Sequence, residues 1–392
     1  MSRDEWPADS ERMSTAPGRP LLLALFEAAA GRAFAPSLPI PEPEIDWAIQ
    51  AGMGPLLHWE SERQPALLPS PIAARVRAAD RLARLESAER LEAVGEILDR
   101  CGERAGPITL LKGISIATEH HRQPHDRAMG DIDLLVEVEG VATLESALVD
   151  LGYRTAGGSR ALDYSHHHHR PPLFHPRTGV CVEVHTGLFP EDSGWLERPP
   201  FSLSSVRAEL RPGSFAGRAV RRLSPELQLV YIATHSALDL HPAVGARALL
   251  DSLLLLRNVG ARLAWDRVCG WLDDRRIAAH LQLVTGYLER RGLVPADAGI
   301  ARARARLAVL APVELRVLDR IVDRHLVRGL PLTDRFGANN RAIVWSTLIA
   351  APRSPWNFAR VAWNLLFPPS HPDRFRARYQ LQRLRSALFP EA

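Results

Sequence analysis

The spacing of hydrophobic residues predicts that the chain begins with helices. In residues 75–101, RVRAADRLARLESAERLEAVGEILDRC, apolar positions recur every three or four residues with charged residues between them, which is typical of a long amphipathic helix. Residues 45–62, IDWAIQAGMGPLLHWESE, show the same spacing. We therefore expect residues 20–104 to form a helical region, and the polar residues 1–19 to be disordered.

After Gly106-Pro107 the pattern changes to short apolar runs separated by turns. ITLL at 108–111 and DIDLLVEV at 131–138 are strand candidates, and the first is followed by a Lys-Gly turn and the start of a helix. Further along lie an amphipathic helix at 141–153, two strands at 166–175 and 180–189 joined by a PRTG turn, and an irregular connection with Pro and Gly at 197–222. This order predicts a small mixed sheet with helices on one face, spanning residues 105–222.

The last part of the chain opens on a helix start at Ser224-Pro225-Glu226. Ser is a favoured cap, Pro suits the first helical position, and Glu suits the positive end of the helix dipole. Helical segments with short loops follow to about residue 330, and shorter ones with GANN, APRSP and FPPSHP breaks follow them. Residues 223–392 are therefore expected to form a helical domain, and the whole chain an α+β fold.

Composition narrows the partners only slightly. The chain has 392 residues, 46% of them hydrophobic, and a formal net charge of +4 with both signs interspersed, so nucleic acid is not indicated as a partner. The basic run RFRARYQLQRLR at 374–385 is an exception. It fits either the solvated face of a terminal helix or a contact with RNA or a membrane, and both interpretations stay open.

Cysteine usage and hydropathy favour a cytoplasmic protein. Cys101, Cys181 and Cys269 are odd in number and far apart, which suits a reducing compartment. The apolar run LLLALFEAAA is short and contains Glu27, so no signal peptide is expected. No apolar stretch reaches the ~18 residues that a membrane span needs.

Lys112 is the single lysine of the chain, whereas the other 48 of its 49 basic residues are arginine. A GC-rich genome explains why lysines are missing, but it does not explain why this one remains. Arginine replaces lysine on most surfaces, yet a planar guanidinium cannot imitate a compact ammonium beside a phosphate. The position of Lys112, in a turn before a predicted helix, therefore favours a functional role.

Asp131 and Asp133 form the first candidate site. On a strand both carboxylates point to the same face, with Cα atoms ~6.6 Å apart. Two acids at the mouth of a buried strand repel each other unless a cation lies between them, and a divalent metal is the natural one. The alternative is a solvent-facing strand end with salt bridges.

A second strand supplies Glu183 and His185, on the face opposite to Val182 and Val184. If this strand lies beside the first, Glu183 becomes a third carboxylate, and three acids on two strands can clamp two Mg²⁺ ions roughly 3.5–4 Å apart. The alternative for Glu183 is an exposed sheet residue paired with arginine.

An anion site is predicted next to these acids. The Lys112-Gly113 turn precedes a helix start, where backbone N–H groups favour phosphate. Arg127 lies four residues before Asp131 and is expected to reach the same anion.

These segments resemble the nucleotidyltransferase superfamily that includes DNA polymerase beta and the aminoglycoside nucleotidyltransferases. Within it the chain is most similar to a large, poorly characterised bacterial group with an LKG turn, an R-x-x-G-D-I-D-L-L-V segment and an E-V-H strand. Here these segments are Leu111-Lys112-Gly113, residues 127–136 and Glu183-Val184-His185, with GMGPLLHW at 52–59 and LSPELQLVYIATHSA at 223–237 also fitting. The resemblance covers roughly residues 40–290.

The resemblance implies transfer of a nucleoside monophosphate from a nucleoside triphosphate, such as ATP, to an acceptor hydroxyl, with release of pyrophosphate. It implies that Asp131, Asp133 and Glu183 are catalytic and hold two Mg²⁺ ions, or Mn²⁺. It further implies that Lys112, Gly113, Ser115, Arg127 and Gly130 bind the nucleotide. The superfamily has Gly-Ser in its first turn, whereas here Ile114 follows Gly113 and Ser115 comes one residue later. Lys112 is expected to replace that serine at the phosphate.

Other polar residues have less specific readings. Four consecutive histidines, His166 to His169, invite a metal assignment, but on a strand only alternate ones share a face, which favours a polar strand near the cleft. His235 and Asp251, on predicted bundle helices, are read as buried hydrogen-bonded groups or as lining of an acceptor pocket.

Three functions remain open at this stage. The protein is an active nucleotidyltransferase acting on a small molecule, an RNA end or a protein side chain, or it is a nucleotide-binding regulatory protein without turnover. A third reading is an antitoxin-like partner that modifies a cognate protein. Intact acids and an intact phosphate turn favour the first, and the acceptor is not encoded in any recognisable motif.

Overall fold

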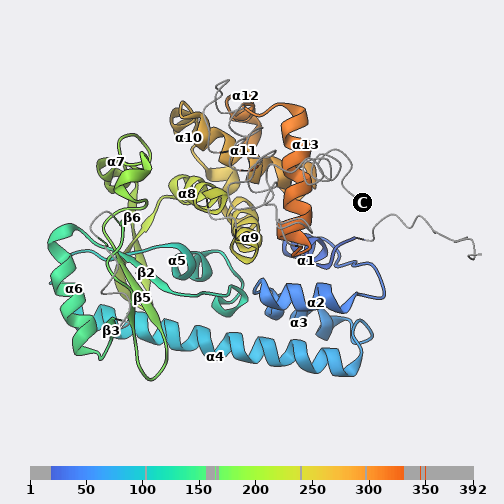
Figure 1. Ribbon diagram of the computed structural model, residues 1–392, viewed down its shortest axis with the longest axis horizontal. Helices are drawn as coiled ribbons and strands as arrows, with labels where there is room; N and C mark the ends of the chain where they lie inside the picture. Colours follow the sequence, from blue (N-terminus) through green and yellow to red (C-terminus); the bar gives the residue numbers. More distant parts are fainter. Residues whose placement is uncertain are drawn as a thin grey trace, which may run out of the picture.

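The computed structural model describes residues 19–330, apart from 102–103, 156–163, 165–166, 239–240 and 296–297, together with Trp345 and Ile349. These residues form thirteen α-helices and one seven-stranded mixed sheet, which confirms the predicted α+β class. Figure 1 shows the sheet at one end of the molecule and the helices of the C-terminal half beside it, with one long helix running beneath both.

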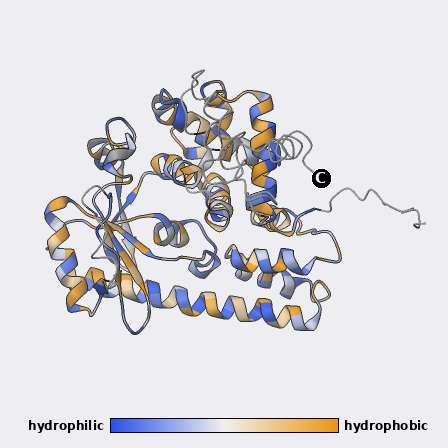
Figure 2. Ribbon diagram, in the orientation of Figure 1, coloured by the Kyte–Doolittle hydropathy of each residue, from blue (hydrophilic) through white to orange (hydrophobic). Residues whose placement is uncertain are grey.

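The N-terminal part is helical, as predicted. Its helices are α1 (Leu21–Ala29), α2 (Glu42–Gln50), α3 (Gly54–Arg63) and α4 (Ser70–Cys101). The long helix predicted at 75–101 is α4, which begins five residues earlier because Ser70-Pro71 already start it. Hydrophilic and hydrophobic residues alternate along α4 (Figure 2), in keeping with its helical periodicity.

The sheet has the strand order β3-β4-β5-β2-β1-β7-β6. The strands are β1 (Thr109–Leu110), β2 (Ile132–Leu135), β3 (Arg154–Thr155), β4 (Leu173–Phe174), β5 (Cys181–His185), β6 (Leu210–Phe215) and β7 (Arg218–Leu223). The central strands β2 and β5 are parallel neighbours, and β4 lies antiparallel to β5 on its far side. The predicted adjacency of the two acid-bearing strands is therefore confirmed.

One face of this sheet is apolar and packs on helices. Ile132 and Leu134 of β2 and Val182 and Val184 of β5 join one hydrophobic core with the C-terminal part of α4 and with α6 (Val138–Asp150). Because side chains alternate along a strand, residues 131, 133, 183 and 185 belong to the opposite face. That face is turned towards the C-terminal half of the molecule.

The prediction of an irregular connection at 197–222 is wrong from residue 203 onwards. Ser202 caps a short helix, α7 (Leu203–Ala208), and residues 210–223 then form the β6–β7 hairpin. The turn residues Ala216 and Gly217 both have positive φ, 47° and 80°, as two-residue hairpin turns require. Alanine is rare at such a position, so the sequence carried no Asn-Gly or Asp-Gly signal for this hairpin.

The C-terminal half begins at Pro225, as predicted. Its helices are α8 (Pro225–Leu238), α9 (Pro242–Val259), α10 (Trp265–Trp271), α11 (Arg275–Arg290), α12 (Arg304–Leu307) and α13 (Pro312–Ile321), followed by a π-helical turn at Val322–Val327. The shorter helices expected after residue 330 and the basic run at 374–385 lie outside the described residues, apart from Trp345 and Ile349.

The N-terminal helices share a hydrophobic core with this C-terminal half. Phe26 of α1, Trp47 of α2 and Leu57 of α3 are buried in one cluster with residues of α8, α9 and α11. The indole of Trp47 donates to the carbonyls of Leu326 and Val327. The predicted domain bounds, 1–19, 20–104, 105–222 and 223–392, stay predictions. Among the described residues no helix has both the length and the apolar character that a membrane span requires.

Candidate functional site

Asp133 is the centre of the polar face of the sheet. It lies in β2 and has no solvent exposure. Its Oδ1 accepts hydrogen bonds from Lys112 Nζ at 2.8 Å and from His185 Nε2 at 2.8 Å. Its Oδ2 is buried and has no hydrogen-bond partner among the described residues. A buried carboxylate oxygen without a partner is costly, so this atom is poised to accept a further cation or donor.

The parallel register brings the second strand to the same place. Asp133 lies directly opposite Glu183, and His185 two residues further along β5 has its Nε2 3.4 Å from a Glu183 oxygen. Asp131 precedes β2 by one residue and lies close enough for its charge to act on Asp133 and Glu183. Asp133 and Glu183 therefore lie side by side on adjacent strands, and Asp131 lies near them just before β2. That all three acids are catalytic stays a prediction.

The carboxylates perturb one another strongly. The negative charge of Asp133, with burial, raises the pKa of Asp131 to about 6. Burial also opposes ionisation of Asp133 and Glu183. For Asp133 the positive charge of Lys112 and the hydrogen bond from His185 outweigh burial. For Glu183 the hydrogen bond from His185 outweighs burial. The pKa values of both acids therefore lie below their usual ranges. The site thus holds more negative charge than its own cations neutralise.

This arrangement fits a divalent cation. One oxygen each of Asp133 and Glu183 and one ring nitrogen of His185 lie within 4.8 Å of one another. The unpartnered Oδ2 of Asp133 and the raised pKa of Asp131 both favour binding of a cation here. Carboxylate oxygens are the ligands that Mg²⁺ and Mn²⁺ prefer. Asp131 does not belong to this group of Asp133, Glu183 and His185.

Lys112 starts α5 (Lys112–Glu119) in an unusual conformation. Its φ is +40°, in the left-handed region that residues other than glycine rarely adopt. This backbone directs Nζ to Asp133, and the side chain keeps only 20% of its surface exposed. Burial alone would lower the pKa of Lys112, but the Asp133 carboxylate outweighs it and holds that pKa above its usual range. The lysine is therefore a fixed positive charge at the edge of the acids.

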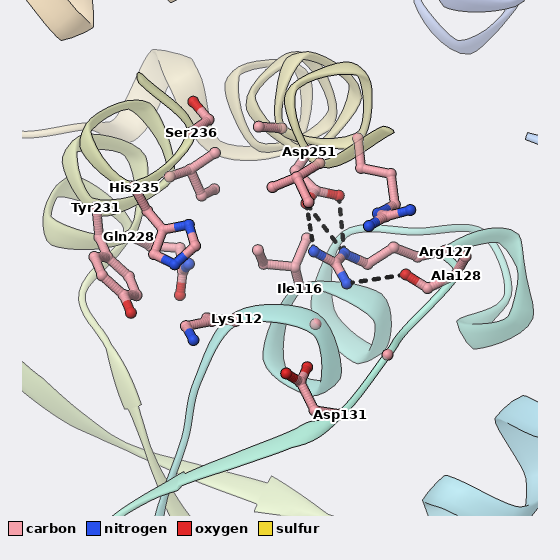
Figure 3. Close-up of a pocket in the computed structure, with 16 residues that line it drawn as sticks. Lys112, Ile116, Arg127, Ala128, Asp131, Gln228, Tyr231, His235, Ser236 and Asp251 are labelled. Atoms are coloured by element: carbon pink, nitrogen blue, oxygen red, sulfur yellow. Dashed lines mark hydrogen bonds and ion pairs between the residues drawn. The ribbon is translucent and has the colours of Figure 1, made fainter. Parts of the chain in front are cut away.

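A pocket of about 230 Å³ opens beside Lys112 and Asp131. Figure 3 shows these two side chains on one side and α8, with Gln228, Tyr231 and His235, on the other. Of the predicted nucleotide-binding residues, Lys112, Gly113, Arg127 and Gly130 line this pocket. The pocket is thus bounded by the turn of the sheet domain below and by the C-terminal helices above.

Comparison with known protein families places the chain in a family. Residues 42–291, more than half of the chain, match a family described as uncharacterised nucleotidyltransferases. The chain belongs to this family. The match spans α2 to α4, the sheet and α8 to α11, close to the range of 40–290 that the motifs predicted. No curated protein and no solved structure matches the chain.

Arg127 has a structural partner. Its guanidinium forms hydrogen bonds to both oxygens of Asp251, at 2.9 to 3.2 Å, and to the carbonyl of Ala128. Asp251 also bonds His121 Nε2 at 2.9 Å. Although Asp251 is buried, Arg127 and His121 lower its pKa to about 2. Arg127 therefore ties the pocket floor to α9, and its predicted contact with phosphate stays a prediction.

Ser115 does not line the pocket. It is fully buried on α5, where its carbonyl and hydroxyl accept hydrogen bonds from Arg222 of β7 at 3.0 and 3.2 Å. These contacts hold α5 against the hairpin. The role of Ser115 in nucleotide binding stays a prediction. Its contacts with Arg222 give it a structural role.

Two residues at the site were not predicted, and a third was predicted without a role. His185, which the sequence placed on the same strand face as Glu183, contacts both Asp133 and Glu183. Gln228 and Tyr231 of α8 have buried polar atoms without hydrogen-bond partners among the described residues and lie on the pocket wall. Their spacing of three residues puts them on one helix face, but that signal cannot be told from ordinary core packing.

The histidine run lies beside the site without entering the group of three. The rings of His168 and His169 have centroids 5.1 and 5.3 Å from that of His185, and His169 pairs with His185 across the sheet. Burial, with the neighbouring His185, lowers the pKa of His168 to about 2. The predicted polar strand is wrong here, because His167 and His168 lie in a bend and His169 forms only an isolated bridge with His185. His166 lies outside the described residues.

Proposed function

We propose that the protein transfers a nucleoside monophosphate from a nucleoside triphosphate to an acceptor hydroxyl, with release of pyrophosphate, and that it needs a divalent metal. One observation carries the proposal. Parallel pairing of β2 and β5 sets Glu183 opposite Asp133, next to Asp131, so three acids from two strands converge beside the Lys112-Gly113 turn. The family match supports the general class of reaction.

Each residue has a separate role in this proposal. Asp131, Asp133 and Glu183 would hold two divalent ions, Mg²⁺ or Mn²⁺, and bound metal would neutralise charge developing on the phosphate oxygens. Lys112 and the backbone N–H groups at the start of α5 would hold the β- and γ-phosphates in the pocket. Glu183, at the partly exposed edge of the site, would face the acceptor and favour its deprotonated form.

The reaction itself then needs positioning more than covalent chemistry. The acceptor oxygen attacks the α-phosphorus while the bond from that phosphorus to the bridging oxygen breaks. Pyrophosphate leaves with the electron pair, and the acceptor proton goes to solvent near Glu183. The buried pair of Lys112 and Asp133 keeps water away from one side of this centre. Electrostatic stabilisation of this kind supplies the largest part of such catalysis.

The test combines labelling with a matched pair of variants. Purified protein would be incubated with α-³²P-labelled nucleoside triphosphates, Mg²⁺ or Mn²⁺, and a lysate fractionated into protein, RNA and small molecules. We expect metal-dependent labelling of one fraction with release of pyrophosphate, and its loss in the Asp131→Asn/Asp133→Asn variant. Circular dichroism would show that this variant is folded.

Asp150→Asn serves as the control, because Asp150 lies in an exposed pair with Arg100, away from the site. This variant is expected to label the acceptor like the wild-type protein. Equal labelling by the double aspartate variant would refute the mechanism. Tight nucleotide binding with no labelling of any fraction would instead favour the reading as a nucleotide-binding regulatory protein.

A further inference from the structure

The metal site contains a nitrogen donor as well as carboxylates. His185 ends β5 and has no solvent exposure. Its Nε2 lies between two acids, 2.8 Å from Asp133 Oδ1 and 3.4 Å from Glu183 Oε2. Only Asp133, Glu183 and His185 form such a group among the described residues. A cation bound by the two carboxylates would therefore meet the imidazole nitrogen at the same time.

The identity of the donors constrains the metal. Mg²⁺ favours oxygen ligands and keeps several waters, whereas imidazole nitrogen suits first-row transition ions. Affinity for a mixed nitrogen and oxygen site also rises from Mn²⁺ along the transition series. An imidazole fixed between two carboxylates thus favours a transition ion over Mg²⁺.

The surroundings hold this imidazole in place. The rings of His168 and His169 pack against His185 from the neighbouring segment, and the β2–β5 ladder fixes its backbone. Glu183 keeps 17% of its side chain exposed, which gives an ion a route from solvent. Asp131 lies outside the group, so a second position between Asp131 and Asp133 would offer carboxylate oxygens alone.

We propose that His185 is a direct metal ligand and that the position formed by Asp133, Glu183 and His185 binds a divalent first-row transition ion in preference to Mg²⁺. The Nε2 proton that His185 donates to Asp133 is released to solvent when the ion binds, which frees the nitrogen lone pair. The inference rests on the proposed function and adds an asymmetry to it. One position of the metal pair carries a nitrogen ligand, and the other carries oxygens only and suits Mg²⁺. The nitrogen-bearing position is the one next to Glu183, on the acceptor side.

Pulsed electron paramagnetic resonance of bound Mn²⁺ tests this directly, since it detects nitrogen nuclei coordinated to the ion. The intact protein would receive half an equivalent of Mn²⁺ in excess Mg²⁺, so that the preferred position fills first. We expect modulation from one ¹⁴N imidazole, replaced by the ¹⁵N pattern when the protein contains ¹⁵N-histidine. This measurement needs no variant and remains decisive even if substitutions at the buried His185 prevent folding.

Two variants locate the nitrogen. His185→Gln is expected to lose the nitrogen modulation and to bind Mn²⁺ at least about tenfold more weakly. His169→Gln, whose ring packs on His185 without joining the ligand group, is expected to keep the modulation. Loss of the signal in His169→Gln but not in His185→Gln would overturn the assignment.

The outcomes also separate this inference from the proposed function. One outcome is that Mn²⁺ binds without any nitrogen modulation and that the Asp131→Asn/Asp133→Asn variant no longer binds it. This outcome would refute the histidine ligand and leave an all-oxygen metal centre. No binding of Mn²⁺ or Mg²⁺ that depends on these aspartates would remove both the inference and the proposed metal-dependent mechanism.

Discussion

At the scale of single residues, Lys112 explains why one lysine persists in an arginine-rich chain. Its Nζ reaches a fully buried carboxylate oxygen at 2.8 Å from a backbone in the left-handed region. Backbone strain of order 1–3 kcal/mol is typical of functional sites, where surrounding structure holds it in place. A compact ammonium fits between Asp133 and the pocket, whereas a planar guanidinium is broader and cannot occupy the same space.

Replacing Lys112 by arginine tests this role. We expect Lys112→Arg to weaken binding of a nucleoside triphosphate by about tenfold, or ~1.4 kcal/mol, because the larger group is displaced from Asp133 and from the pocket. Isothermal titration with a non-hydrolysable triphosphate measures the change. The reverse exchange at an exposed ion pair, Arg100→Lys, provides the control and should leave affinity unchanged. Equal affinity in Lys112→Arg would make the lone lysine an accident of codon usage.

At the scale of elements, Gly113 at the start of α5 packs closely against the loop before β2. A side chain at Gly113 would have its Cβ 2.6 Å from Arg127 Nη1 and 3.1 Å from Met129 Cγ. Arginine side chains usually yield to such contacts, but Asp251 and the Ala128 carbonyl hold this one. The glycine of the turn is therefore required for packing, independently of any contact with phosphate.

A pair of alanine substitutions separates packing from chemistry. Gly113→Ala is expected to displace the Arg127 guanidinium from Asp251 and to lower the free energy of unfolding by about 1–3 kcal/mol. Gly130→Ala is the matched control, because a Cβ there has no atom within 4 Å, and it should change that free energy by less than about 0.5 kcal/mol. Urea denaturation measures both. Equal stability of the two variants would contradict the predicted clash.

At the scale of the whole molecule, a buried ionic link joins the sheet domain to the C-terminal helices. Asp251 of α9 binds Arg127 and His121, which both lie in the connection between α5 and β2. The pocket lies across the same boundary, since its walls come from α5, α8 and α9. The helical half thus shapes the site as well as stabilising the fold, and the N-terminal helices share its core.

Removing Asp251 should weaken this link in a pH-dependent way. Asp251→Asn leaves the Arg127 charge buried without its partner, so we expect a loss of about 3–5 kcal/mol in the free energy of unfolding at neutral pH. The folded pKa of Asp251 is about 2, below its unfolded value of about 3.9, so its contribution is complete above about pH 5. The contribution is then lost as pH falls from about 4 towards 2.

Urea denaturation of wild-type protein and Asp251→Asn between pH 7 and 3 measures this. The difference between them should stay constant down to about pH 5 and shrink below about pH 4. Asp150→Asn, which removes an exposed carboxylate, should show little difference throughout that range. A difference for Asp251→Asn that grows on acidification would have the wrong sign for this assignment.

The sequence by itself determined the elements whose signals are local. Periodicity gave the long helix α4, alternation gave the strands around Asp133 and Glu183, and Ser-Pro-Glu gave the start of α8. Such patterns depend on neighbours a few residues apart, so a single sequence carries them. The hairpin turn at Ala216-Gly217 was not predicted from the sequence. Pairing of the flanking strands overrides the low preference of alanine for positive φ.

Only the tertiary structure decided which side chains meet. His185 reaches Asp133 across 52 residues of sequence, and Arg127 reaches Asp251 across 124. Both contacts depend on strand register and on helix docking, which follow from burying apolar faces far from the polar groups themselves. The shared face of the acids and His185 was predictable because these residues alternate on strands. The contact of His185 with Asp133 and the buried partner of Arg127 were not, because nothing local specifies the partner of a side chain.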